Sequence, residues 1–275
     1  MRLYLTVAFL MALWSPPGFS GELLFQGDLE QGALVLAVAA PGALVLVNGR
    51  AVQVDDTGGF MFGLGRDHSP TLVIDVRFID GTATRRTLTV RQRRYPEQHI
   101  DNLSRKMVTP PAEVRERIAR EAGAVRDARA HASNATHIRS GLIWPIFGPV
   151  TGIYGSRRIL NGEPRAPHYG IDIAAPLGAP VQTMAAGMVR LADELYLSGN
   201  TVIVDHGHGI TSSYLHMQDI SVRENQRISQ GHVIGHVGAT GRTSGPHLDW
   251  RINWFEVRLD PELVAGPQMT GNSTN

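Results

Sequence analysis

The stretch NTVIVDHGHGITSSYLHM, from Asn200 to Met217, decides the fold of the C-terminal half of this 275-residue chain. Apolar and polar residues alternate on both sides of a turn that contains Gly207 and Gly209. Alternation with period two is typical of a β-strand with one buried face. Two such runs joined by glycines predict an antiparallel pair of strands.

The same β-strand pattern extends through the rest of the C-terminal half. Beyond Gly141, short β-like runs are separated by glycine turns, and no segment has the pattern of a long helix. The clearest further runs are MVRLADELY (188–196), RISQGHVIGHVG (227–238) and HLDWRINWF (247–255). They predict a mainly β, antiparallel domain over residues 141–266, followed by a disordered tail at 267–275.

A second group of short strands occupies residues 21–96. The runs are ALVLAVA (33–39), LVLVNG (44–49), GFMFGLG (59–65), TLVIDVRF (71–78) and RRTLTVRQR (85–93). Strands at this spacing, with turn residues between them, are typical of a small antiparallel sandwich. We interpret the segment as an Ig-like β-sandwich accessory domain that positions the other domain or docks to a cell-wall or envelope protein.

Residues 97–140 are expected to be a linker that contains a helix. Within it, TPPAEVRERIAREAGAVRDARAHAS (109–133) has helical features. Thr109 can cap the first turn, Pro110 suits it, and Glu113 adds a favourable negative charge there. The charged residues of this helix are expected to form a solvated face.

The N-terminal residues 1–20 have the pattern of a signal peptide. A short basic start is followed by the apolar run Leu3–Trp14, and Gly18 and Ser20 allow cleavage before Gly21. The run is shorter than the roughly 20 residues that a membrane-spanning helix needs. We therefore expect a periplasmic or secreted protein with no stable membrane span after cleavage; an uncleaved anchor is the alternative.

Composition excludes several classes of function. The chain has no cysteine, so disulfides, thiol catalysis and cysteine metal sites are excluded. Its single lysine, Lys106, lies in the linker, which argues against Schiff-base enzymes, Walker-type phosphate loops and lipoyl carriers. A formal charge of +1 gives no indication of nucleic-acid binding.

The stretch PHYGID contains His168 and Asp172. Gly170 argues against a shared helix face, and four extended residues span about 13 Å. One metal ion could therefore bind both side chains only if the chain bends, which Gly170 permits. The alternative is a surface histidine followed by a turn aspartate.

The stretch SGPHLDW contains His247 and Asp249. On a strand these two residues share a face, with Cα atoms about 6.6 Å apart, so both side chains can approach one ion. Leu248 and Trp250 then face the core. The alternative is a core pair whose hydrogen bonds are satisfied within the protein.

His216, in SSYLHM, is expected to share a strand face with Tyr214, and a lone half-buried histidine is the alternative interpretation. Other histidines have weaker patterns. Asp205, His206 and His208 lie among glycines typical of a tight turn, and His232 and His236 have HxxxH spacing without the glutamate of the helical zinc motif.

Taken together, these stretches resemble the lysostaphin-type zinc metalloendopeptidases, a family that acts on peptidoglycan. The resemblance covers roughly residues 144–261 and rests on order, spacing and glycine context. It is carried by GIYGSRRI (152–159), HYGIDIAAPLGAPV (168–181), AAGMV (185–189), NTVIVDHGHG (200–209), SSYLHM (212–217), QGHVIGHVGATG (230–241) and SGPHLDW (244–250).

The resemblance implies that His168 and Asp172 are metal ligands and that His216 and His247 are catalytic. Asp249 takes the place of the third ligand, where this family usually has a histidine. Carboxylate oxygen binds zinc at about the same distance as imidazole nitrogen, so one zinc ion is expected. Manganese is the alternative to zinc because two of the three ligands would be carboxylates, but it is less favoured than zinc.

The function that the resemblance implies is metal-dependent hydrolysis of the peptide cross-links of peptidoglycan, with the peptide stems as substrate. An activated water would attack the scissile carbonyl, and two histidines would assist. The alternative is a non-catalytic relative that binds or activates another cell-wall hydrolase, which the aspartate at position 249 favours. The segment ILNGEPRAP (159–167) is expected to form one groove wall or a flap.

Overall fold

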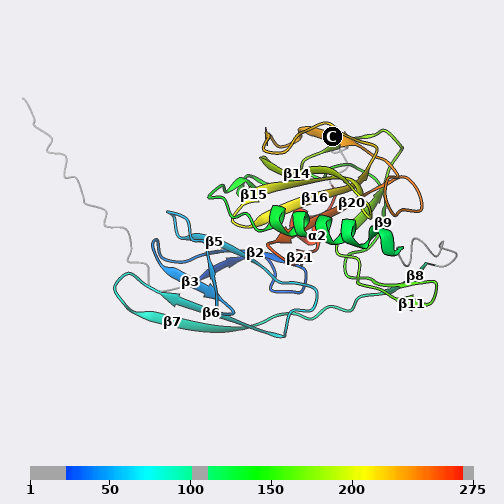
Figure 1. The fold of residues 1–275 in the computed structure, drawn as a ribbon. Helices are drawn as coiled ribbons and strands as arrows, with labels where there is room; N and C mark the ends of the chain where they lie inside the picture. The colour runs from blue at the N-terminus through cyan, green and yellow to red at the C-terminus, as the bar shows by residue number, and fades with distance from the viewer. Residues whose placement is uncertain (1–22, 101–110, 269–275) are drawn as a thin grey trace, which may run out of the picture.

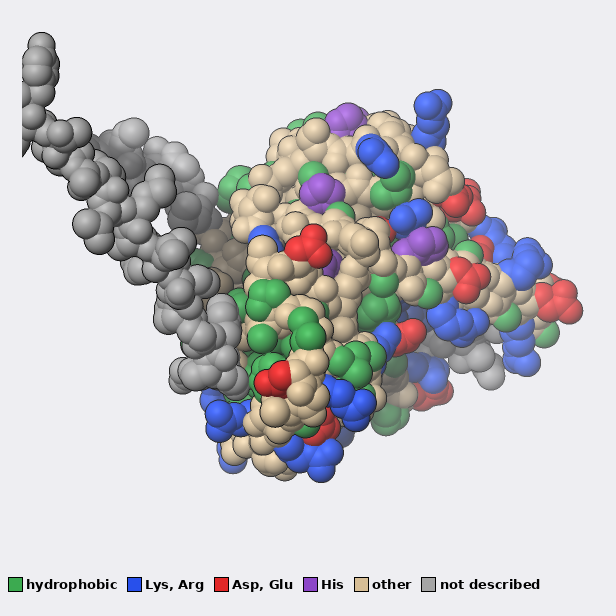
Figure 2. All heavy atoms as spheres, turned by 90° about the vertical axis from the view of Figure 1, so that its left-hand side faces the viewer, with side chains coloured by type: hydrophobic (Ala, Val, Ile, Leu, Met, Phe, Trp, Pro, Cys, Tyr) green, Lys and Arg blue, Asp and Glu red, His purple; other side chains and the backbone are tan. Residues whose placement is uncertain are grey.

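The computed structural model describes residues 23–100 and 111–268, and it confirms a mainly β, antiparallel fold (Figure 1). The predicted signal peptide lies outside the described residues. Within them, no helix is both long and apolar enough to cross a membrane. On the face shown in Figure 2, acidic and basic side chains are mixed, in line with the low net charge.

An eight-stranded antiparallel sheet forms the centre of the C-terminal half. Its order is β18-β14-β15-β16-β20-β12-β9, and β21 pairs with β20. The strands are β9 (Val150–Gly152), β12 (Ile171–Ala174), β14 (Gly187–Leu195), β15 (Gly199–Gly207), β16 (Ile210–Met217), β18 (Arg227–Ile228), β20 (His247–Trp254) and β21 (Val257–Leu259). β15 and β16 are the pair predicted by the alternating stretch 200–217.

Two small sheets flank this one. The first has the order β13-β19-β17, with β13 (Pro180–Gln182), β17 (Asp219–Ile220) and β19 (Val233–His236). The second has the order β11-β10-β8, with β8 (Glu97–Ile100), β10 (Arg157–Leu160) and β11 (Glu163–Pro164). β8 runs parallel to β10, so the start of the predicted linker is anchored beside the segment 159–167.

The N-terminal region contains two antiparallel sheets, and each of the five predicted runs contains a strand. One sheet has the order β1-β2-β5 and the other β4-β3-β6-β7. The strands are β1 (Leu24–Gln26), β2 (Leu34–Val38), β3 (Leu44–Val47), β4 (Arg50–Val52), β5 (Gly59–Gly63), β6 (Thr71–Arg77) and β7 (Ala83–Thr89). The assignment of this region as Ig-like stays a prediction.

The N-terminal region packs against the C-terminal half, and Figure 1 shows β5 close to β21, which it contacts. A Cβ atom at Gly63 would lie 2.7 Å from Leu259 and 3.0 Å from Trp254, so glycine lets the two regions approach closely. An ion pair of 2.7 Å joins Arg93 to Asp260 across the same contact. The buried apolar side chains of both regions form one continuous cluster.

The linker contains the predicted helix, as the 3₁₀ turn η1 (Ala112–Val114) followed by α2 (Arg115–Arg129). The expected cap at Thr109 lies outside the described residues. Helix α2 contacts β14 and β15, where Ala128 packs with Leu191, Leu195 and Ile203 (Figure 1). The helix therefore covers part of the central sheet.

Two short helical elements border the C-terminal half of the chain. The 3₁₀ turn η2 (His137–Ser140) precedes the C-terminal half, and α3 (Pro261–Ala265) follows β21, with Asp260 as its N-cap. Of the tail predicted over residues 267–275, the structure describes only the first two residues, and residues 269–275 lie outside the described part. The Gln268 side chain donates to the Gly148 carbonyl at 2.8 Å and accepts from its N–H at 3.2 Å.

Candidate metal centre

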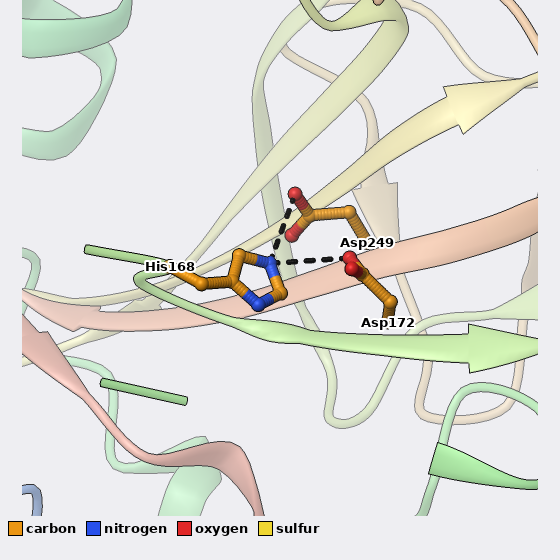
Figure 3. Close-up of side chains that lie close together, drawn as sticks. All are labelled: His168, Asp172 and Asp249. Carbon is orange, nitrogen blue, oxygen red and sulfur yellow. Dashed lines mark ion pairs between the residues drawn. The ribbon is translucent and has the colours of Figure 1, made fainter. Parts of the chain in front are cut away.

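The antiparallel pairing of β12 with β20 places Asp172 directly opposite Asp249. His168 lies just before β12, and its ring points at both carboxylates (Figure 3). Its Nε2 atom is 3.1 Å from Oδ1 of Asp172 and 3.5 Å from Oδ2 of Asp249. The structure therefore brings together the three side chains that the sequence suggested as ligands, although they lie up to 81 positions apart.

The group has the properties of a cation site. Among the described residues it is the group of His, Asp and Glu side chains whose ligand atoms all lie within 4.8 Å of one another. Both ring nitrogens of His168 and Oδ1 of Asp172 are buried and form no hydrogen bond. Buried polar atoms without partners are costly in a folded protein, and a bound cation would satisfy them.

The charges of the group are strongly coupled. Burial alone would lower the pKa of His168, but the carboxylates of Asp172 and Asp249 outweigh it, so the pKa is raised. Burial would raise the pKa of Asp249, but the guanidinium of Arg251 holds it well below its ordinary value. The lowered pKa of Asp249 keeps negative charge on its oxygens, as ligation of a metal requires, whereas the proton that the raised pKa favours on His168 must leave before its nitrogen can bind a metal.

Gly170 has a role that differs from the predicted one. A Cβ atom at this position would lie 2.6 Å from the Trp250 carbonyl oxygen and 2.8 Å from Oδ1 of Asp249. Only glycine allows the chain between His168 and Asp172 to pass this close to β20. The glycine is therefore needed for close approach of two backbones at the site.

His247 and His216 lie side by side at the edge of the ligand group, with ring centroids 5.0 Å apart. Nε2 of His247 is 3.6 Å from Oδ1 of Asp172, and its Nδ1 lies 2.9 Å from the Gly245 carbonyl. Nδ1 of His216 lies 2.8 Å from the Thr240 carbonyl. A carbonyl only accepts, so Nδ1 of each ring carries a proton and donates it to that carbonyl.

The environment of His216 favours the neutral ring. Burial lowers its pKa below the ordinary value, and the nearby carboxylate of Asp249 offsets only part of this effect. A neutral histidine with a free Nε2 lone pair can accept a proton at neutral pH.

The prediction that His216 shares a strand face with Tyr214 is wrong. The Tyr214 hydroxyl accepts from the Met184 N–H at 2.8 Å in the core, whereas the His216 ring lies against His247. The pairing of β15 with β16 shifts register between Asn200 and Val202, and His216 has a φ of 64°. This bulge turns the histidine to the face that carries the ligands.

Two arginines at the site were not expected from the sequence. Nε and Nη2 of Arg251 donate to Oδ1 and Oδ2 of Asp249 at 2.8 and 2.5 Å, and Nη2 of Arg158 donates to Oδ2 of Asp172 at 2.9 Å. The sequence could have placed Arg251 on the same face as Asp249, because it follows that residue by two positions on a strand. Arg158 is on β10, and no local pattern indicates that β10 lies against β12.

The ligands lie in a cavity of about 490 Å³. The expected groove wall is present: Arg165, Ala166 and Pro167, at the end of segment 159–167, line it together with Arg158. His216 and His247 line it as well. One cavity therefore contains the three ligand candidates and both histidines.

The other histidines do not join this group. Nδ1 of His206 lies 2.8 Å from the Ala186 carbonyl and its Nε2 lies 2.7 Å from the Ser212 hydroxyl. His236, on β19, pairs with the exposed Asp219 at 2.9 Å. These contacts agree with the prediction that His206 and His236 are not metal ligands.

Comparisons with known proteins agree with this geometry. Residues 166–261 match the family model described as peptidase family M23. The peptidoglycan DD-endopeptidase ShyA of Vibrio cholerae is 41% identical over 87 residues, which cover 32% of this chain and 20% of that protein. ShyC of the same organism, also a peptidoglycan DD-endopeptidase, is 33% identical over 124 residues, which cover 44% of this chain and 28% of that protein.

The match to curated relatives is therefore confined to about a quarter of their length. A crystal structure from Pseudomonas aeruginosa that is assigned to peptidase M23 extends the similarity over 87% of this chain and 96% of the other, at 26% identity and a TM-score of 0.68. The matched segment contains all three ligand candidates and both histidines of the site. Residues 166–261 of this chain form a domain of peptidase family M23.

Proposed function

We propose that this chain is an exported, zinc-dependent endopeptidase that hydrolyses the peptide cross-links of peptidoglycan in the periplasm or outside the cell. The observation that carries the proposal is the convergence of His168, Asp172 and Asp249, with buried ligand atoms that form no hydrogen bond within the protein. The peptidase family M23 match and the peptidoglycan endopeptidases among the relatives support the substrate class. The N-terminal signal-peptide pattern supports export.

The donor set fits a single zinc ion. One imidazole nitrogen and two carboxylate oxygens would leave a coordination position open, which is the arrangement of catalytic zinc. Although Arg251 donates to both oxygens of Asp249, each carboxylate oxygen has two lone pairs, so ligand capacity remains. Bound zinc would polarise the scissile carbonyl and lower the pKa of a water molecule toward about 7.

The two histidines supply proton transfer. His216, kept neutral by burial, accepts the proton of the attacking water at Nε2. His247, whose Nδ1 is fixed by Gly245, directs its Nε2 toward the ligand group and assists the developing oxyanion or the leaving amine once it is protonated. Asp249 and Arg251 together are neutral, as a histidine is, so the replacement of the family's usual histidine leaves the formal charge at the metal unchanged.

The experiment that tests this function combines elemental analysis of the purified chain with a digest of purified cross-linked muropeptides. We expect about one zinc ion per chain and release of uncross-linked products. His216→Ala should keep the metal and lose about 10²–10⁴-fold in rate, the usual contribution of a general acid–base group. Normal cleavage by His216→Ala would remove this histidine from the mechanism.

A second candidate function is a non-catalytic wall-binding or activating role. The observation that favours it is that Arg251 and Arg158 already balance the charges of Asp249 and Asp172. Full metal occupancy without cleavage of any muropeptide would favour this role. Metal-dependent cleavage would exclude it as the main activity.

A further inference from the structure

Gln98 is a neutral polar residue of the metal cavity whose side chain has no partner within the described part of the chain. It lies on β8 and lines the cavity together with His168, Asp172 and Asp249. Its Oε1 atom is buried and forms no hydrogen bond, and among the described residues its carboxamide nitrogen has no partner either. Buried amides normally have their hydrogen bonds satisfied, so Gln98 has binding capacity that the described protein does not use.

The pairing of β8 with β10 explains why this side chain lies at the metal site. The two strands are parallel, and Gln98 lies opposite Arg158 in their register. Opposed residues of neighbouring strands point to the same face of a sheet, with the strands about 4.8 Å apart. Nη2 of Arg158 is 2.9 Å from Oδ2 of Asp172. The carboxamide of Gln98 is therefore one strand away from a side chain that contacts a ligand candidate.

The neighbours of Gln98 on β8 do not share this environment. Glu97 and His99 do not line the cavity, and each has more than half of its side chain exposed. Glu97 pairs with His99 at 3.8 Å and with the exposed Arg157 at 3.2 Å. The alternation of β8 therefore places one neutral polar side chain in the cavity, between two ionisable side chains that face solvent.

The chemistry of a carboxamide suits the backbone of a peptide. It has one carbonyl acceptor and two N–H donors, which are the groups that pair with the N–H and C=O of a peptide bond. It is also neutral, so it does not compete with Asp172 for Arg158, as a carboxylate at this position would. A glutamine is thus able to bind an uncharged peptide group without disturbing the charges at the ligand group.

We propose that Gln98 binds the substrate directly, through a hydrogen bond between its carboxamide and one peptide group near the scissile bond. This inference rests on the proposed endopeptidase function and adds a substrate-binding residue to it. Because each extended residue spans about 3.4 Å, the contacted group lies within about two residues of the bond that is cut. β8 precedes residues 166–261, so the linker supplies part of the substrate cleft.

The test uses synthetic cross-linked stem peptides and the full zinc-loaded chain. Binding is measured by fluorescence anisotropy with peptides whose scissile amide is replaced by a non-hydrolysable hydroxyethylene group. A series carries an ester in place of one peptide bond at a time on either side of that group. An ester lacks the N–H and has a weaker carbonyl acceptor, so it perturbs any hydrogen bond to that peptide group. Cleavage of the parent peptide gives kcat and KM.

The variant is Gln98→Met, which keeps the length of the side chain and removes its hydrogen bonds. His99→Met is the matched control, because His99 is the next residue of β8 and lies outside the cavity. We expect Gln98→Met to raise Kd and KM about three- to tenfold, the usual contribution of one neutral hydrogen bond. Its kcat, zinc content and melting temperature should be unchanged, because a contact made throughout the reaction changes KM alone. The control should behave as the unmodified chain.

The ester series separates a direct contact from a structural role. In the unmodified chain one ester should weaken binding about three- to tenfold, and in Gln98→Met the same ester should cause no further loss. Ester losses of equal size in both chains would overturn the inference, because other residues would then make the contacts. A series in which no ester weakens binding by the unmodified chain would overturn it without any variant.

The outcomes also separate this inference from the proposed function. Equal Kd values of Gln98→Met and the unmodified chain would overturn the contact and leave the endopeptidase in place. Peptide binding that depends on Gln98, without cleavage of any cross-linked peptide, would keep the contact and overturn the endopeptidase.

Discussion

Two buried groups of histidine and aspartate lie on the same central sheet, and they have opposite chemistry. At the end of β15, where the sequence indicated a tight turn, Asp205 and His206 lie on the strand; both ring nitrogens of His206 have partners, and Asp205 pairs with Arg190 at 3.1 Å. Beside β12 and β20, neither ring nitrogen of His168 forms a hydrogen bond. Burial of a histidine is therefore a weak indicator of function. Buried polar atoms that form no hydrogen bond and face other ligand atoms are a strong one.

The pKa values of the two histidines shift in opposite directions. Burial lowers the pKa of His206 to about 4, and the hydrogen bond to Ala186 and the charge of Asp205 offset only part of this effect. At His168 the same burial is outweighed by Asp172 and Asp249, so its pKa is raised. The surroundings of His206 stabilise a neutral ring, and the two carboxylates beside His168 stabilise a positive charge.

The largest effect is expected from exchanging each histidine for glutamine. His168→Gln should remove nearly all bound zinc and reduce muropeptide cleavage to background, because it deletes the only imidazole ligand of the group. His206→Gln should retain the zinc, because its two hydrogen bonds are internal to the sheet. Elemental analysis after dialysis measures both, and equal zinc content in the two variants would contradict the comparison.

The second prediction concerns the charge balance at β20. Asp249→His restores the family's usual ligand but leaves Arg251 without its carboxylate. Breaking such a pair typically costs about 3–5 kcal/mol in the free energy of unfolding, and the 24% exposure of the Arg251 side chain favours the lower end. The unpaired guanidinium should also oppose cation binding.

The double variant Asp249→His/Arg251→Gln removes that charge and should bind zinc more tightly than Asp249→His alone. Urea unfolding of the metal-free proteins and competition with a chelator measure the two effects. Tighter zinc binding in the single variant than in the double would show that Arg251 does not act through charge.

Much of the fold was readable from the sequence because its signals are local. The strands around 200–217 and 247–254 follow from alternation within each segment, and α2 follows from its composition. The convergence of His168, Asp172 and Asp249 was suggested by short motifs in a family-like order. For the strands and the helix the information lies within a short window of neighbouring residues, whereas the convergence depended on the order of the motifs along residues 144–261.

The rest depends on contacts that no single segment encodes. The face of His216 is set by a bulge against β15, which changes the register of two strands. The partnership of Arg158 with Asp172 depends on how β10 packs beside β12, and the shared core depends on Gly63 meeting β21 and β20. These are tertiary relations, which override local pattern.

The third prediction tests the close approach of two backbones at the ligand group. Gly170→Ala would place a methyl group 2.6 Å from the Trp250 carbonyl oxygen. Because the obstacle is backbone, we expect a destabilisation of about 3 kcal/mol, at the upper end for overpacking, together with weaker zinc binding. Gly245→Ala is the matched control, since an added Cβ there meets nothing within 4 Å. Equal melting temperatures for the two variants would show that the strand shifts at no cost.

The smallest effect is a pH dependence that belongs to His206, near the end of β15. The folded-state pKa of His206 is about 4, against an ordinary value of 6.5, so below pH 6.5 the unfolded chain binds a proton that the folded chain does not. Stability should therefore fall as the pH drops from 6.5 toward 4, by about 2 kcal/mol at pH 5 from this residue alone. His206→Gln removes the titrating ring and should flatten this part of the profile, as urea unfolding of the metal-free proteins at pH 7 and pH 5 would measure. An unchanged slope in the variant would mean that water reaches His206, and the contrast with His168 would then no longer rest on burial.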